Sequence, residues 1–105
     1  MNSKLYERIT FVLPKDEVKR LKVNEGKELP EITVDVHGMK CVQVRKLLNN
    51  LINVVRTAIR IIVIHGFNHG QEIKNMLADD FYNDHIVNHF ADVRNQGVTY
   101  ILTAA

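Results

Sequence analysis

The sequence predicts an α/β fold, because one strand–loop–helix pattern occurs twice in the chain. The first strand ends in Val36-His37-Gly38 and the second in Ile64-His65-Gly66, and a helical pattern follows each of them. The connection between them is long enough for a right-handed crossover, which would make the two strands parallel. Ligands collect at the carboxyl ends of parallel strands. Both His-Gly turns should therefore lie at one edge of one sheet.

Residues 1–30 are expected to form an N-terminal extension, and residues 31–105 the main domain. Residues 8–13 are apolar enough for a short strand. Pro14 would end that strand or open a helix over residues 16–21, since proline is tolerated at a first helical position. Residues 24–27 are typical of a turn, and Pro30 disfavours helix before the next strand.

The strands of the main domain are predicted from apolar patterning. Residues 31–37 alternate between apolar and polar side chains, which indicates a strand with one buried face. Residues 60–64 are continuously apolar, as in a central strand. Residues 98–102 form a last strand after a turn at Gln96-Gly97, whereas residues 86–93 fit either a strand or a helix.

Helical spacing of apolar residues predicts two helices, over residues 41–57 and 71–82. Their inward residues are expected to be Val44, Leu47, Leu48, Leu51, Ile52 and Val55 in the first, and Ile73, Met76, Leu77 and Phe81 in the second. Lys40 is a poor N-cap, so the first helix would leave its leading backbone N–H groups available to an outside acceptor.

Composition indicates one ordinary globular domain. The chain has 105 residues and a formal net charge of +2, and its apolar runs are far too short to span a membrane. The single cysteine, Cys41, excludes an intrachain disulfide and suits a reducing, cytoplasmic setting. Residues 36–76 are basic and residues 77–105 acidic. The basic part suits phosphate-bearing partners, although a solvated helix surface explains the same charges.

The loop His65-Gly66-Phe67-Asn68-His69-Gly70 lies between a strand and a helix. Glycines in such a loop let the backbone approach a phosphate at the helix N-terminus. The loop lacks the lysine of a P-loop and the middle glycine of a dinucleotide-binding loop. A tight connection between strand and helix would explain the same glycines.

Asp35 and His37 are candidates for acid–base chemistry. A carboxylate can orient an imidazole, and histidine titrates close to neutral pH. Gly38 can adopt positive φ, so it can turn the chain where both side chains are needed. Alternatively, Asp35 caps a helix or accepts a hydrogen bond from a loop amide.

Metal binding is a further possibility. The pairs His65/His69 and His85/His89 have the spacing that zinc sites use on helices, but the first pair lies in a glycine-containing loop. A divalent cation such as Mg²⁺ or Mn²⁺ could bind Asp35, although the sequence identifies too few further oxygen ligands. The sequence identifies no certain cofactor. A nucleophilic role for Cys41 is a weaker hypothesis than metal binding.

Four segments together resemble the small MutS-related (Smr) domain family. Val34-Asp35-Val36-His37-Gly38-Met39 looks like the family's Leu-Asp-Leu-His-Gly-Leu signature. His65-Gly66 with Gly70 looks like its glycine loop, Lys74 matches a basic residue of the second helix, and residues 97–102 are similar to the last strand. The resemblance covers about residues 32–103, so the chain would be a stand-alone member.

The resemblance implies a two-layer α/β sandwich, β-α-β-α-β-β, with a mixed four-stranded sheet like that of the C-terminal domain of bacterial translation initiation factor three. It also implies binding to DNA or RNA, with endonucleolytic cleavage in several members. The expected catalytic residues are Asp35, His37 and His65. The expected phosphate-binding residues are Gly38, Gly66, Asn68, His69, Gly70, Lys74 and Arg45.

Departures from the family pattern leave other functions open. Asn68 stands where the loop usually has a glycine, Asp80 where the helix often has a tryptophan, and Gly97 where a glycine pair is usual. A module that binds nucleic acid without cleaving it is therefore the alternative. A protein-interaction module is a third possibility, in which Phe67 and the segment Ile9–Leu13 contact a second copy or a partner protein.

Overall fold

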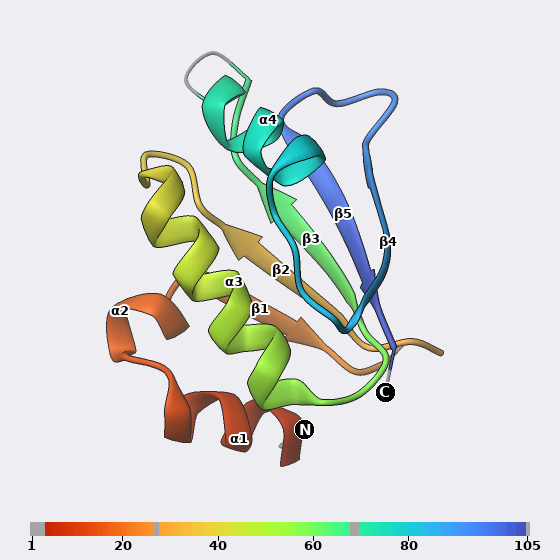
Figure 1. The fold of residues 1–105 in the computed structure, drawn as a ribbon. Helices are drawn as coiled ribbons and strands as arrows, with labels where there is room; N and C mark the ends of the chain where they lie inside the picture. Colours follow the sequence, from red (N-terminus) through yellow and green to blue (C-terminus); the bar gives the residue numbers. More distant parts are fainter. Residues whose placement is uncertain (1–3, 27, 68–69, 105) are drawn as a thin grey trace.

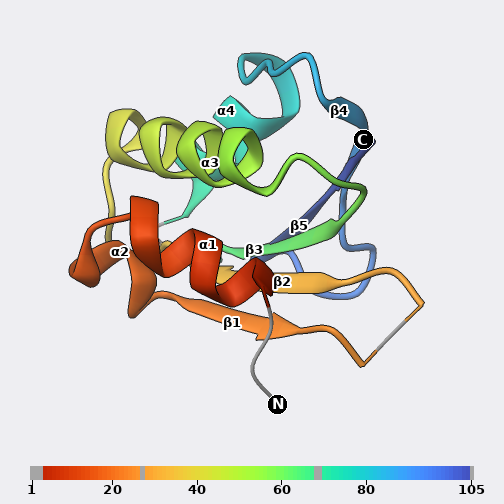
Figure 2. The same ribbon diagram turned by 90° about the horizontal axis from the view of Figure 1, so that it is seen from below.

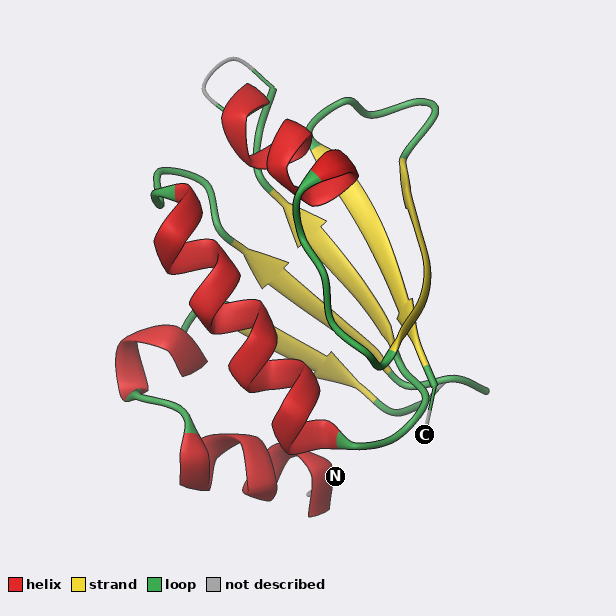
Figure 3. Cartoon of the chain, in the orientation of Figure 1, coloured by secondary structure: helices red, strands yellow, loops and turns green. Residues whose placement is uncertain are grey.

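The structure, a computed structural model, describes residues 4–26, 28–67 and 70–104. These residues form an α/β fold with a mixed five-stranded open sheet (Figures 1 and 3). The elements follow one another as α1 (Lys4–Val12), α2 (Lys15–Val18), β1 (Leu21–Asn24), β2 (Glu31–Asp35), α3 (Cys41–Val55), β3 (Arg60–Ile64), α4 (Gln71–Asp79), β4 (Ile86–Ala91) and β5 (Val98–Thr103).

The sheet has the strand order β1-β2-β3-β5-β4. β2 and β3 are parallel, as predicted, and Asp35 pairs with Ile64 at their carboxyl ends. β5 is antiparallel to β3, so its first residue, Val98, lies beside Ile64. The C-terminal ends of β2 and β3 and the N-terminal end of β5 therefore lie side by side.

The core lies between the sheet and the helices. Ile32, Val34, Ile61 and Val63 are fully buried on the side of the sheet that faces the helices. The apolar stripe of α3 is buried from Val44 to Val55, because its helical spacing places it toward the same side. α3 and α4 cover this side, and no described helix covers the other (Figure 2).

The side of the sheet away from the helices, which we call the uncovered face, carries the alternate residues of each strand. Thr33, Ile62 and Tyr100 lie there in register on β2, β3 and β5, and each is partly exposed. Asp35 belongs to the same face, because side chains along a strand alternate and Val34 points into the core.

The N-terminal residues differ most from the prediction. The strand expected over residues 8–13 is wrong, since residues 4–12 form helix α1. Leu5, Ile9 and Leu13 are buried in the common core at a spacing of four residues, which is helical. The predicted helix after Pro14 is a single turn, α2.

β1 was not predicted, and it pairs with β2 as a fifth strand in place of the four expected. Arg8 Nη1 also donates to the carbonyl of Val55, 3.0 Å away, at the C-terminus of α3. The described part of residues 1–30 thus shares the core and the sheet of the main domain.

The remaining boundaries differ only at their ends. β2 stops at Asp35, and α3 ends at Val55 because Arg56 adopts a left-handed conformation with φ 54°. α4 is three residues shorter than predicted, and β5 extends to Thr103. The ambiguous segment forms strand β4. Among the described residues, none of the helices has the length and apolar character that a membrane span requires.

Candidate functional site

The end of β2 places Asp35 and His37 side by side. They are two residues apart, so the alternation that directs Asp35 to the uncovered face also directs His37 there. Between them, Val36 is fully buried, and its N–H donates to the Ile64 carbonyl at 2.9 Å. Gly38 then turns the chain with φ 81°, as the sequence predicts.

The Asp35–His37 pair is joined by a short hydrogen bond. His37 Nδ1 lies 2.5 Å from Asp35 Oδ1, and the backbone N–H of His37 donates to the same oxygen at 3.2 Å. The side chain of His37 is 70% exposed and that of Asp35 46%. Because Asp35 occupies Nδ1, the ring presents Nε2 as the nitrogen available to a bound molecule.

Arg20, which directly precedes β1, is hydrogen-bonded to the backbone of this pair. This role was not identified from the sequence. Arg20 Nη1 donates to the carbonyl of Asp35 at 3.0 Å and to that of His37 at 3.5 Å. Burial by itself would raise the pKa of Asp35, but hydrogen bonds from His37 and the positive charge of Arg20 outweigh burial, so the pKa lies below its usual value. The carboxyl group is therefore ionised at neutral pH.

No sequence motif could have revealed Arg20. It lies fifteen positions before Asp35, in a segment outside the resemblance, and reaches Asp35 only because β1 pairs with β2. The Asp35 N–H in turn donates to the Arg20 carbonyl at 2.9 Å. Only the pairing of β1 with β2, which is a tertiary contact, indicates that Arg20 reaches Asp35.

His65 does not join the Asp35–His37 pair. It is 1% exposed, and its Nε2 lies 2.9 Å from the hydroxyl of Thr99 on β5. Its Nδ1 lies 3.0 Å from the Gly66 carbonyl. Burial lowers the pKa of His65, the nearby charge of Lys74 lowers it further, and only the Gly66 hydrogen bond opposes them. The ring is therefore neutral and links β3 to β5.

The glycines of the second loop allow backbone segments to touch. A Cβ added at Gly70 would lie 2.2 Å from the carbonyl oxygens of both His65 and Gly66. A Cβ at Gly97 would lie 3.1 Å from the Gly66 carbonyl carbon, and the Gly97 carbonyl accepts from the N–H groups of His65 and Gly66. Close packing of the chain alone explains these glycines. Asn68 and His69 lie outside the described residues.

The two loops meet through Gly66 and His37. Gly66 has φ 85°, and a Cβ on it would be 4.0 Å from the Cβ of His37. The predicted convergence of two strand ends is thus observed, but it brings His37 to Gly66 rather than to His65.

The two predicted phosphate-binding cations have different surroundings. Lys74 lies in the first turn of α4, near enough to His65 for its charge to lower that pKa. Arg45 instead donates to the carbonyl and to Oδ2 of Asp80, at 2.9 and 3.0 Å, and so ties α3 to the C-terminal end of α4. This ion pair is possible because aspartate occupies position 80.

The described residues offer a poor site for a resident metal. They contain no group of three or more histidine, cysteine, aspartate or glutamate side chains that could hold one. Asp35 Oδ1 is already bonded to His37. His89 lies in strand β4, so the helical spacing of His85 and His89 does not bring them to one side of a helix. Magnesium held by one carboxylate needs ligands from a bound substrate.

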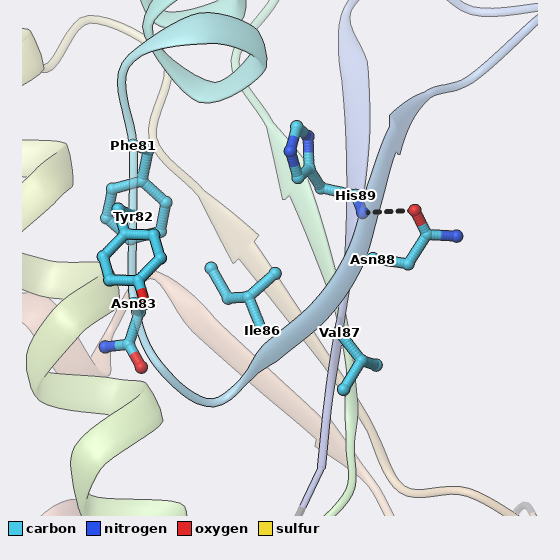
Figure 4. A pocket seen from close by; sticks show the side chains of 7 residues that line it. All are labelled: Phe81, Tyr82, Asn83, Ile86, Val87, Asn88 and His89. Carbon is cyan, nitrogen blue, oxygen red and sulfur yellow. Dashed lines mark hydrogen bonds between the residues drawn. The ribbon is translucent and has the colours of Figure 1, made fainter.

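Two surface hollows flank the sheet. One, of ≈ 320 Å³, adjoins Asp35 on the uncovered face and is lined by Lys19, Arg20, Leu21, Lys22, Thr33, Asp35 and Ile64. The other, of ≈ 290 Å³, lies between β4 and the segment after α4, where Ile86 faces Phe81 and Tyr82 (Figure 4). The first hollow is cationic and adjoins the Asp35–His37 pair, whereas the second contains none of the predicted site residues.

Comparisons of the chain with models of protein families, with curated proteins and with solved structures gave no match. The function is therefore inferred from the geometry of the site and from the motifs of the sequence.

Proposed function

We propose that the protein binds DNA or RNA and cleaves a phosphodiester bond, as a cytoplasmic member of the Smr-like domains with the fold of the C-terminal domain of initiation factor three. The observation that carries this proposal is the Asp35–His37 pair, exposed at the meeting point of two strand ends. It combines a proton-transfer group with a carboxylate that orients it.

His37 supplies proton transfer in this proposal. With Nδ1–H donated to Asp35, Nε2 can accept the proton of an attacking water or hydroxyl, and the imidazolium formed is stabilised by the carboxylate. Such a group contributes roughly 10²–10⁴-fold to a rate. The rest of the rate enhancement must come from stabilisation of the phosphate charge. The candidate cations are Arg20, which contacts Asp35, and Lys74, which lies near His65.

A binding module without chemistry is the second candidate. The observation that favours it is the openness of the site, since the His37 side chain is 70% exposed and its ring is hydrogen-bonded to Asp35 alone among the described residues. Enzymes usually exclude water from the reacting centre, which strengthens each electrostatic contact. A protein that only binds has no such requirement.

Cleavage of labelled RNA and of supercoiled DNA tests the two candidates. We expect His37→Ala to lower the cleavage rate about 10²- to 10⁴-fold. His89→Ala, which removes an exposed histidine from β4, is the matched control and should cleave like the wild type. Parallel reactions with Mg²⁺, Mn²⁺ or EDTA determine the cation requirement. Equal cleavage by both variants would reject His37 as the catalytic group, and retention of binding without any cleavage would establish the second candidate.

A further inference from the structure

The uncovered face of the sheet is apolar at its centre. Ile62 and Ile64 on β3, with Tyr100 and Leu102 on β5, are partly exposed there, whereas their neighbours Ile61, Val63 and Ile101 are buried under the helices. The register places Ile62 directly opposite Tyr100. A soluble two-layer fold has no need of apolar side chains on its solvent side, so the face is suited to a partner.

An aromatic pair lies on one side of this face. Phe90 on the edge strand β4 is paired in register with Tyr100 on β5, and their ring centroids are 5.4 Å apart with an interplanar angle of 33°. Phe90 is 47% exposed. The Tyr100 hydroxyl donates to Asp92 Oδ2 at 2.7 Å, which fixes the orientation of its ring. Rings held on a sheet in this way offer flat surfaces for stacking.

Positive charge lies on the opposite side of the same face. Lys22 on β1 is paired with Thr33, and Lys19, Arg20 and Lys22 line the hollow beside Asp35. The single acid of that hollow is Asp35, whose charge is already shared with His37 and Arg20. The hollow is therefore complementary to an anion.

We propose that the uncovered face binds a single strand of nucleic acid, with a base stacked on Phe90 and Tyr100 and phosphates at Lys19, Arg20 and Lys22. This inference rests on the proposed function and identifies its substrate as unpaired. From β1 to β4 the sheet is four strand spacings wide, roughly 19 Å, which accommodates a few nucleotides. A duplex hides its base surfaces, so only an unpaired strand can use both the cationic hollow and the rings.

The same path leads to the Asp35–His37 pair. Asp35 lines the cationic hollow and also bonds His37, so a phosphate in the hollow lies next to the catalytic pair. The segment that contributes Lys19, Arg20 and Lys22 precedes the part of the chain that resembles the Smr domain. The N-terminal segment thus supplies the phosphate contacts of the substrate strand.

Binding of short labelled oligonucleotides tests the inference. The His37→Ala protein, in which substrate stays intact, is titrated against fluorescein-labelled oligo-dT, oligo-U and a blunt duplex, with anisotropy as the readout. We expect Phe90→Ala to weaken single-strand binding about tenfold. Phe11→Ala, which removes a 92% exposed phenylalanine from α1 on the helical side, is the matched control and should leave binding unchanged.

The salt dependence of binding measures the contribution of the cationic residues. Lys22→Ala should reduce the slope of log affinity against log salt by about 0.7, the value for one phosphate contact with a single strand. Lys4→Ala, on α1, should leave the slope unchanged. Comparison of oligo-dT with oligo-U shows which of the two nucleic acids is preferred.

A tryptophan variant distinguishes loss of stacking from loss of binding through misfolding. The chain contains no tryptophan, so Phe90→Trp introduces a single one at the stacking position. We expect this variant to retain single-strand affinity and its fluorescence to be quenched by oligo-dT or oligo-U but not by the duplex.

Three results would overturn the inference: Phe90→Ala binding as tightly as Phe11→Ala, no quenching of the tryptophan, or a dimer in light scattering that Phe90→Ala dissociates. Cleavage by the wild type that is insensitive to Phe90 and Lys22 rejects this inference alone. Binding that depends on both residues, without cleavage, rejects the endonuclease alone.

Discussion

His37 and His65 show how one residue of register decides what a histidine can do. Both follow an apolar strand and precede a glycine, but Asp35 pairs with Ile64, so His65 is level with Val36 and His37 with Gly66. Side chains alternate along each strand, so Val36 and His65 turn toward the core while His37 stays on the uncovered face. The repeated motif is therefore offset by one residue between the strands.

The buried His65 should make the fold sensitive to mild acid. Its pKa is lowered in the folded protein, so below pH 6.5 the unfolded chain binds a proton that the folded protein resists. The contribution of the neutral ring to stability is complete above about pH 6.5 and is lost as the pH falls through the lowered value. We expect the thermal midpoint to fall between pH 7.5 and pH 5, as measured by circular dichroism.

His65→Gln is the control for this prediction. Glutamine does not titrate, so the variant should be less stable at pH 7.5, where its contact with Thr99 is altered, but should lose less between pH 7.5 and pH 5. Asp35 does not contribute to the change in stability between pH 7.5 and pH 5. Its pKa is lowered from the usual 3.8, so its effect on stability appears only at more acidic pH. An identical pH profile for both proteins would contradict the role given to His65.

At the scale of elements, the loop between β3 and α4 is closed by contacts between backbone groups. No side chain fits at Gly70, because a Cβ there would lie 2.2 Å from the carbonyl oxygens of both His65 and Gly66. Gly38 in the first loop is different, since a Cβ there would meet nothing within 4 Å and only its φ of 81° favours glycine. The two glycines are needed for separate physical reasons.

Alanine substitution should separate the two reasons. Gly70→Ala forces the loop apart, and we expect it to lower the free energy of unfolding by roughly 1–3 kcal/mol or more. Gly38→Ala meets only the left-handed strain, about 1–2 kcal/mol. Urea unfolding of both variants measures the difference. A Gly70→Ala protein that is as stable as Gly38→Ala would show that the loop relaxes without cost.

The main-domain elements were predictable because their patterns are long or strongly apolar. α3 has fifteen residues with a continuous stripe, and β3 is apolar throughout. Of the candidate site, the pairing of Asp35 with His37 was predicted from a turn at Gly38, whereas alternation along the strand is what places both side chains on the uncovered face. The contacts of Arg20 with Asp35 and of Arg45 with Asp80 were not predictable, because they depend on which elements become neighbours. α1 was mistaken for a strand because residues 9–13 are mostly apolar, and the helical spacing becomes visible only when Leu5 is included.

At the scale of the whole molecule, the N-terminal segment completes both layers. α1 adds Leu5 and Ile9 to the core beside α3, and β1 adds a fifth strand to the sheet. The expectation that residues 9–13 contact a second copy is only partly compatible with this arrangement, because Ile9 and Leu13 are buried within the chain. Phe11, between them, is exposed.

Truncation of one buried residue in α1 tests this arrangement. Ile9 is fully buried, so we expect Ile9→Ala to lower the free energy of unfolding by about 2–5 kcal/mol. Phe11→Ala, at a 92% exposed position two residues later, should change it by less than about 0.5 kcal/mol. Chemical denaturation followed by circular dichroism measures both. Equal stability of the two variants would mean that α1 is not part of the cooperative fold.

The loop that carries His37 is fastened from two directions, by Arg20 from one neighbouring strand and by the Ile64 carbonyl from the other. Arg20 precedes this loop in the sequence, whereas Ile64 follows it. A chain still emerging from the ribosome already contains the acid and the imidazole, but it lacks one of their anchors until β3 has been made. His37 should therefore reach its final position only once β3 has paired with β2, because the Ile64 carbonyl belongs to that strand.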